Sequence, residues 1–165
     1  MRSPRARPQQ VGIVVDITDR QKLLRIGKPW LERLVRRALA AQGIERAEIG
    51  LLLGDDRRIA AIHAEWLGDP SPTDVITFDL SEEGEGILRG DIVVSTETAR
   101  RASREFGSTP RQEVAYYVVH GLLHLTGYDD LAPRQRRAMR LRERAVMRHV
   151  GQPLPTRRRP ARGRA

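Results

Sequence analysis

Hydrophobic residues along this chain switch between two spacings, and each switch marks the expected border of a helix or a strand. Residues 11–17 are rich in β-branched side chains, which predicts a strand. From Pro29 to Gln42 apolar residues recur at helical spacing, and Gly43 follows as a stop. Continued along the chain, this reasoning predicts strands at 11–17, 47–53, 75–80 and 88–95, and helices at 29–42, from 56 to a loop at 68–72, 96–106, 110–127 and 133–149.

The helix expected after Pro110 is hydrophobic almost all round from Val114 to Leu125, which favours a central, buried position. A short acidic, glycine-rich segment joins the last two strands and predicts a hairpin-like antiparallel pair. We therefore expect an α+β fold in a single domain. A small mixed sheet of about four strands should pack with helices around that central helix.

Positive charge is concentrated at the two ends of the chain. The formal net charge is +9, and eight arginines lie within residues 1–10 and 151–165. Both ends lack apolar periodicity, so we expect disordered basic tails at 1–10 and 151–165 around a folded domain at 11–150. Such tails favour a polyanionic partner, since clustered arginines attract phosphate backbones without regard to sequence.

The composition also limits the cellular compartments in which the protein is expected to act. No apolar run approaches the ~18 residues of a membrane span, and the first ten residues lack the apolar core of a secretory signal. The chain has no cysteine, which removes any disulfide partner. A cytoplasmic location without membrane contact is the expectation.

Two histidines in the central helix provide the main candidate for chemistry. His120 and His124 are four residues apart, so their side chains lie one turn apart on one helix face. Gly127 suits a turn at the helix end that brings Asp129 or Asp130 back towards both imidazoles. Three nitrogen and oxygen ligands with one open position are typical of a catalytic zinc ion, whereas structural zinc sites usually have four ligands rich in cysteine.

The neighbouring residues argue against one familiar class of zinc enzyme. Helical zinc proteases carry glutamate directly after the first histidine as general base, and this chain has Gly121 there. A simpler interpretation of His120 and His124 as hydrogen-bonded structural residues also exists, and we favour it for His63, which has no second ligand at metal-site spacing.

Three segments resemble the YbeY family of metal-dependent endoribonucleases. The segment from His120 to Asp130 is similar to the family signature His-Gly-x-x-His-x-x-Gly-Tyr-Asp-His except at its last position. Residues 72–78 resemble the family's Pro-Thr-Asp/Asn-Val-Leu-Ser-Phe segment, and 90–95 resemble its Gly-Asp-Ile strand. Asp130 stands where the family has its third histidine, and Leu67 stands where many members have an arginine thought to handle RNA.

The resemblance implies a single-strand-specific endoribonuclease that acts in small-subunit ribosomal RNA maturation and ribosome quality control. One Zn²⁺ ion would be held by His120, His124 and Asp130, with a position left for water or a phosphate oxygen. Asp129 is the candidate for proton transfer. Four arginines that flank the signature are candidate contacts to the RNA backbone: Arg104, Arg111, Arg134 and Arg137.

Two alternatives to this prediction remain open from the sequence. One is a metal-dependent hydrolase of another class, such as a peptidase, which Gly121 disfavours. The other is a ribosome-associated binding module whose metal is structural, which the basic tails and the changed third ligand favour. RNA substrate and small-subunit partners are thus expectations that depend on the resemblance.

Overall fold

The computed structural model describes residues 12–71 and 73–156. Within these residues the helices and strands follow the order that the hydrophobic spacing predicts. They are β1 (Ile13–Asp19), α1 (Lys28–Ala40), β2 (Ala47–Gly54), α2 (Asp56–Leu67), β3 (Val75–Asp79), β4 (Leu88–Ser95), α3 (Thr96–Phe106), α4 (Pro110–Leu125) and α5 (Pro133–His149).

The four strands form one mixed sheet in the order β1-β2-β4-β3. β1 pairs with β2 and β2 with β4 in parallel, whereas β3 runs antiparallel to β4. The predicted α+β fold and the predicted antiparallel pair are therefore confirmed. β3 is therefore an edge strand.

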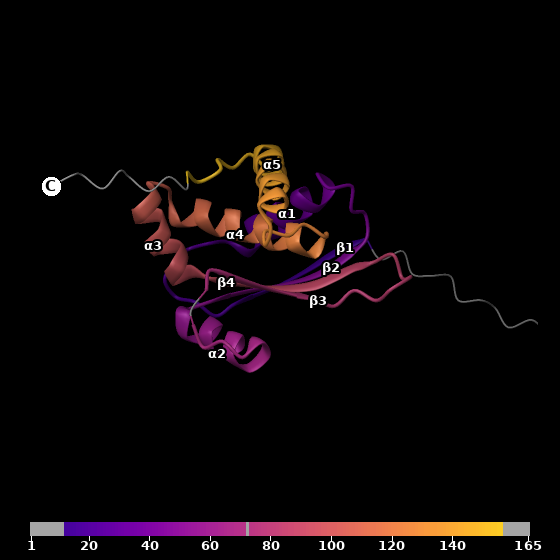
Figure 1. Ribbon diagram of the computed structural model, residues 1–165. Coiled ribbons are helices and arrows are strands. Elements are labelled where there is room, and N and C mark those ends of the chain that lie inside the picture. Colours follow the sequence, from indigo (N-terminus) through magenta and orange to yellow (C-terminus); the bar gives the residue numbers. More distant parts are fainter. Residues whose placement is uncertain (1–11, 72, 157–165) are drawn as a thin grey trace, which may run out of the picture.

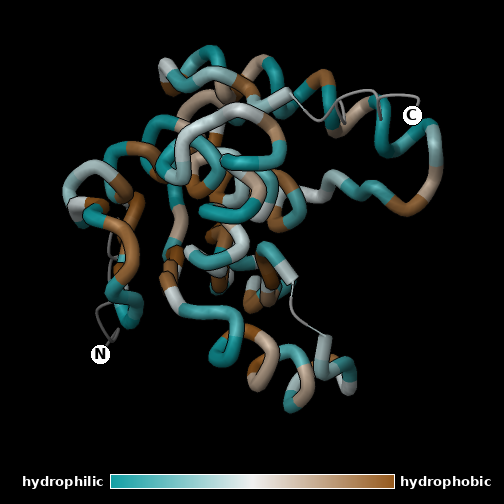
Figure 2. Tube along the Cα trace, turned by 90° about the vertical axis from the view of Figure 1, so that its left-hand side faces the viewer, coloured by the Kyte–Doolittle hydropathy of each residue, from teal (hydrophilic) through white to brown (hydrophobic). Residues whose placement is uncertain are grey.

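The helices cover the sheet unequally. α1, α4 and α5 lie on one face, α2 lies on the opposite face, and α3 packs beside α4 (Figure 1). Hydrophobic and hydrophilic residues follow one another at short intervals along the coiled parts of the chain, as their colours show (Figure 2). Such spacing lets a surface helix bury one stripe of side chains against the sheet or another helix.

α4 occupies the centre of the larger core, as its apolar sequence predicts. It packs against β3 and β4 on one side and against α1, α3 and α5 on the others. Val114, Val118 and Leu122 of α4 are completely buried. A smaller cluster of Ile59, Ile76 and Val93 lies under α2 on the other face of the sheet.

Local capping explains where the key helices begin. Thr109 accepts a hydrogen bond from the backbone N–H of Gln112, whose side chain accepts one from the N–H of Thr109, and Pro110 occupies the first turn. Ser95 caps α3 in the same way through the N–H of Thr98. Each such cap stabilises its helix by about 1 kcal/mol.

The two ends of the described fold are formed by β1 and by the chain after α5. β1 begins two residues later than expected, because its pairing with β2 extends from Ile13 to Asp19. Beyond α5, Leu154 packs against the hydrophobic core, so the fold continues past residue 150. The tail predicted at 1–10, and residues 157–165 of the tail predicted at 151–165, lie outside the described residues.

Candidate metal centre

His120 and His124 share one face of α4, and their rings meet edge to face. The two Nε2 atoms are 3.1 Å apart. Their side chains are 19% and 26% exposed, so the pair lies at the border of the core. The otherwise buried helix α4 is therefore partly exposed at this histidine pair.

The turn after α4 brings a carboxylate to this pair. Gly127 has a φ of +101°, a left-handed conformation that glycine adopts without strain. The chain reverses there, and the backbone N–H of Tyr128 donates to the carbonyl oxygen of Leu123. Asp130 then places its carboxylate oxygens 3.7 Å from His120 Nε2 and 3.9 Å from His124 Nε2.

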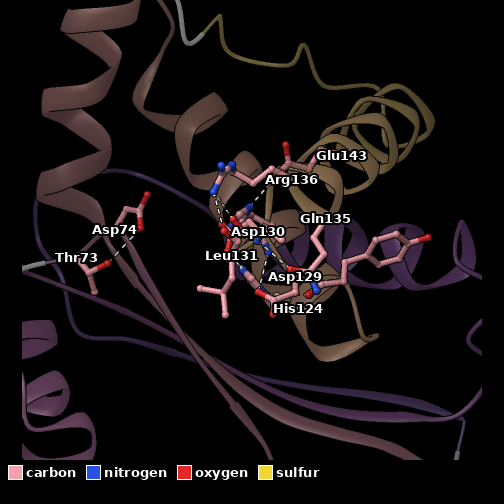
Figure 3. A network of polar contacts seen from close by, with 12 residues as sticks. Thr73, Asp74, His124, Asp129, Asp130, Leu131, Gln135, Arg136 and Glu143 are labelled. Atoms are coloured by element: carbon pink, nitrogen blue, oxygen red, sulfur yellow. Dashed lines mark hydrogen bonds and ion pairs between the residues drawn. The ribbon is translucent and has the colours of Figure 1, made fainter.

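Arg136 of α5 stabilises the same turn through hydrogen bonds. Nη1 of Arg136 donates to the carbonyl oxygens of Asp130 and Leu131 at 3.2 and 2.8 Å. Figure 3 shows these residues grouped between α4 and α5, with Thr73 and Asp74 on the opposite side of the view. The third candidate ligand is therefore positioned by two helices rather than by a loose loop.

The outer nitrogen of each imidazole has its own acceptor. His120 Nδ1 lies 2.6 Å from a carboxylate oxygen of Glu143, and His124 Nδ1 lies 3.1 Å from the carbonyl oxygen of Tyr128. A carbonyl and an ionised carboxylate can only accept, so both Nδ1 atoms carry the proton. The Nε2 atom of each ring is then directed towards the other ring and towards Asp130.

This donor set fits a metal ion. Two Nε2 atoms at 3.1 Å are stabilised by a cation between them, either a shared proton or a metal ion. Tetrahedral zinc, with bonds of about 2.0–2.1 Å, requires ligand atoms about 3.3 Å apart. His120, His124 and Asp130 offer three ligand atoms that all lie within 4.8 Å of one another.

The sequence interpretation missed Glu143, which holds the outer nitrogen of His120. Glu143 is only 3% exposed, and Tyr116 donates its hydroxyl to both carboxylate oxygens at 3.3 Å. The sequence did contain a signal for Glu143. It is the only acid in the arginine-rich sequence of α5, and it shares a buried face of this helix with Met139 and Met147. A carboxylate on an apolar helix face needs a partner.

Two cavities meet at the metal centre. One, of about 240 Å³, is bordered by α2, β3 and α4 and is lined by His63, Leu67, Asp74, His120 and His124 among others. The second, of about 410 Å³, lies along α3 and α4. Asp74 and His120 line both cavities, so a ligand at the imidazoles can extend in two directions.

The remaining candidate residues lie away from these cavities. The carboxylate of Asp129 accepts the backbone N–H of Asp130 at 2.7 Å and so shapes the turn. Arg111 stacks over the ring of Trp30 at 4.1 Å. Arg104, Arg134 and Arg137 are exposed on α3 and α5. None of these five lines either cavity, and their roles in proton transfer and RNA contact stay predictions.

His63 is a hydrogen-bonded residue, as expected from the sequence, and Gly121 lies in a crowded place against the sheet. His63 Nδ1 is hydrogen-bonded to the carbonyl oxygen of Ser71 at 2.9 Å, and the residue also lines the smaller cavity. Gly121 faces the sheet, where an added Cβ would come within 3.0 Å of Ile92 and Thr77. A side chain at that position would have to displace Ile92 and Thr77, which disfavours the glutamate base of a helical zinc protease there.

Fold and site together define a class: a small α+β protein with two histidines on its central helix, an aspartate from the turn that follows this helix, and two cavities that meet at the first histidine. In agreement with this class, the chain belongs to the endoribonuclease YbeY family, whose sequence model matches residues 16–151.

Individual relatives support the same family. The chain is 37% identical over 145 residues to the endoribonuclease YbeY of Desulforamulus reducens, covering 82% of this chain and 92% of that protein. For the Bacillus licheniformis relative of the same name, identity is 30% over 155 residues, covering 86% and 97%. The Anaeromyxobacter relative is 44% identical over 129 residues, covering 76% and 67%.

A solved structure supports the fold. The solution structure of TM1509 from Thermotoga maritima superposes with a TM-score of 0.56 at 24% identity, covering 88% of this chain and all of that one. Within residues 12–71 and 73–156, no helix is both long and apolar enough to cross a membrane.

Proposed function

We propose that this protein is a zinc-dependent endoribonuclease that cleaves single-stranded RNA, and that it acts in small-subunit ribosomal RNA maturation and ribosome quality control. The observation that carries the proposal is the convergence of His120 Nε2, His124 Nε2 and Asp130 in a chain of the endoribonuclease YbeY family. The absence of cysteine supports a three-ligand catalytic ion over a closed structural one.

When bound, a zinc ion at this group supplies a Lewis acid that offsets negative charge on phosphoryl oxygens and activates water. The chain's own residues prepare that place. Glu143 and the carbonyl of Tyr128 hold the two imidazoles in the tautomer that exposes Nε2. Asp130, with a side chain 43% exposed, completes the ligand set and stays open to substrate.

The shape of the site supports an unpaired RNA strand as substrate. His120 lies where two cavities meet, and His124 lines one of them. An unstacked strand can bend its backbone into such a junction, whereas paired bases hold the backbone along a rigid helix. The exposed Arg104, Arg134 and Arg137, with Arg111, would add salt-dependent attraction for the rest of the strand.

The role in ribosome assembly depends on the family resemblance, and the basic ends of the chain agree with it. Ribosomal RNA and the small subunit present dense phosphate surfaces. Eight arginines in the first ten and last fifteen residues favour binding to such surfaces.

The variant His120→Ala tests the activity directly. Zinc-loaded wild type should cleave a single-stranded RNA oligonucleotide, and His120→Ala should lose cleavage by at least about 100-fold while keeping its fold, because α4 still packs through its apolar side chains. Chelation should abolish wild-type activity and added zinc should restore it. His149→Ala, which removes a histidine at the exposed end of α5, is the matched control.

Parallel assays separate the proposal from its two alternatives. Cleavage of casein without cleavage of RNA would assign the site to a peptidase. Zinc binding with no hydrolysis of single-stranded RNA, duplex RNA or casein would make the metal structural. Full RNA cleavage in a rigorously metal-free preparation would refute zinc dependence.

A further inference from the structure

The larger cavity beside the metal centre, which we name the α3 cavity, has features of a separate substrate subsite. It is lined by Thr98, Arg101 and Phe106 of α3, by Tyr116 and Tyr117 of α4, and by His120 itself. Its volume of about 410 Å³ falls within the range of roughly 300–1,000 Å³ that is typical of small-ligand sites. A nucleotide that follows the one at the imidazoles can therefore enter it.

Arg101 gives this cavity its positive charge. Among the described residues that line the two cavities at His120, it is the only lysine or arginine. Asp74 and Glu105 also line the α3 cavity, so the lining without Arg101 would repel a polyanion. The side chain of Arg101 is 59% exposed and can reach a ligand.

Neighbouring groups hold Arg101 in place. Nη1 donates to a carboxylate oxygen of Asp56 at 2.5 Å, and Nη2 donates to the hydroxyl oxygen of Thr98 at 2.9 Å. A guanidinium has five N–H donors, so this anchoring uses only part of them. Asp56 in turn accepts from the hydroxyls of Ser95 and Thr98 at 2.5 and 2.8 Å, which shares its charge among several donors.

Three aromatic residues, which we name the aromatic wall, also line the cavity. Phe106 and Tyr116 are partly exposed, and Tyr117 is 2% exposed. Ring faces beside a guanidinium are the combination that binds single-stranded nucleic acids, because bases stack on the rings while the cation contacts the backbone. The wall and Arg101 therefore match the two parts of one nucleotide.

We propose that the α3 cavity binds the nucleotide next to the cleaved linkage, with Arg101 contacting its backbone phosphate and the aromatic wall contacting its unpaired base. This inference rests on the proposed function, and it assigns to Arg101 a contact that the sequence pattern gave to other arginines. Asp56 is a positioning residue, since it acts through Arg101.

Binding of a probe that resists cleavage tests the subsite. Zinc-loaded protein is titrated with a fluorescent single-stranded 2′-O-methyl oligonucleotide, and the Kd is measured by anisotropy. Arg101→Ala should raise the Kd about ten-fold, as expected for a charge-assisted contact. Arg100→Ala removes the same charge from an exposed neighbour that does not line the cavity, and it should change the Kd less than about two-fold.

A second measurement locates the contact. Single neutral methylphosphonate linkages are placed at successive positions of the probe. Wild type should lose affinity most at one position, and Arg101→Ala should show no extra loss there. An unchanged position dependence in Arg101→Ala would overturn the proposal.

The variant Asp56→Asn separates a substrate contact from a structural role. It removes the charge that positions Arg101 and keeps the guanidinium, so the Kd of the probe should rise about three-fold, less than in Arg101→Ala. Equal loss of affinity in Asp56→Asn and Arg101→Ala would mean that Arg101 only stabilises the ends of α2 and α3. Failure of wild type to cleave RNA would refute the proposed function, whereas an unchanged Kd in Arg101→Ala would refute the subsite alone.

Discussion

Removing the charge of Glu143 should weaken zinc binding without unfolding the protein. Its carboxylate lies 2.6 Å from His120 Nδ1 and is almost fully buried. An ionised acceptor at this position keeps the proton on Nδ1 and makes Nε2 a better electron donor. Loss of such a contact to a ligating histidine typically costs about 10–100-fold in metal affinity.

The two ends of that range correspond to two substitutions. Glu143→Gln keeps an oxygen acceptor and nearly the same volume, so we expect about a ten-fold loss of zinc affinity, or about 1.4 kcal/mol. Glu143→Leu leaves the Nδ1 proton without an acceptor in the core, so we expect about a 100-fold loss. Tyr116→Phe removes only the 3.3 Å contacts to Glu143 and should cost less than about three-fold.

Competition with a chromogenic chelator at fixed pH measures these affinities. Thermal unfolding of the metal-free proteins shows whether each variant keeps its fold. Glu65→Gln, an exposed acid on α2, controls for the change in net charge. Wild-type zinc affinity in folded Glu143→Gln and Glu143→Leu would refute the role assigned to Glu143.

Two further predictions concern other carboxylates. Asp130→Ala should lose zinc, and Asp130→His and Asp129→Ala should retain it, because only Asp130 belongs to the three-residue group; zinc depletion in Asp129→Ala alone would show that the register is wrong. Partial burial opposes ionisation of Asp56, but hydrogen bonds from Arg101, Ser95 and Thr98 outweigh it and hold its pKa below the usual 3.8. The ionised form therefore stabilises the fold above about pH 4. Urea unfolding should show this advantage of wild type over Asp56→Asn shrinking as the pH falls below 4, and a difference that is constant down to pH 2 would contradict it.

Local patterns in the sequence determined the order of the elements and the geometry of the histidine pair. His120 and His124 meet because a four-residue spacing within one helix fixes their separation, whatever the helix packs against. Gly127 likewise predicted a turn that brings Asp129 or Asp130 back to them, and in the structure the carboxylate beside them is that of Asp130. The antiparallel pair of β3 and β4 was predictable because a short connection leaves few other arrangements.

Contacts between distant segments were decided by the tertiary structure. Glu143 lies 23 residues after His120 and reaches it only because α5 packs across α4. Arg101 was one of several arginines before the motif. It differs from the others because it lines a cavity formed by α3, α4 and the chain before β3. Charge and spacing identify residues able to bind a metal or a phosphate. Which of them line the site depends on how helices far apart in the sequence pack together, and one helix's sequence does not encode the position of its neighbours.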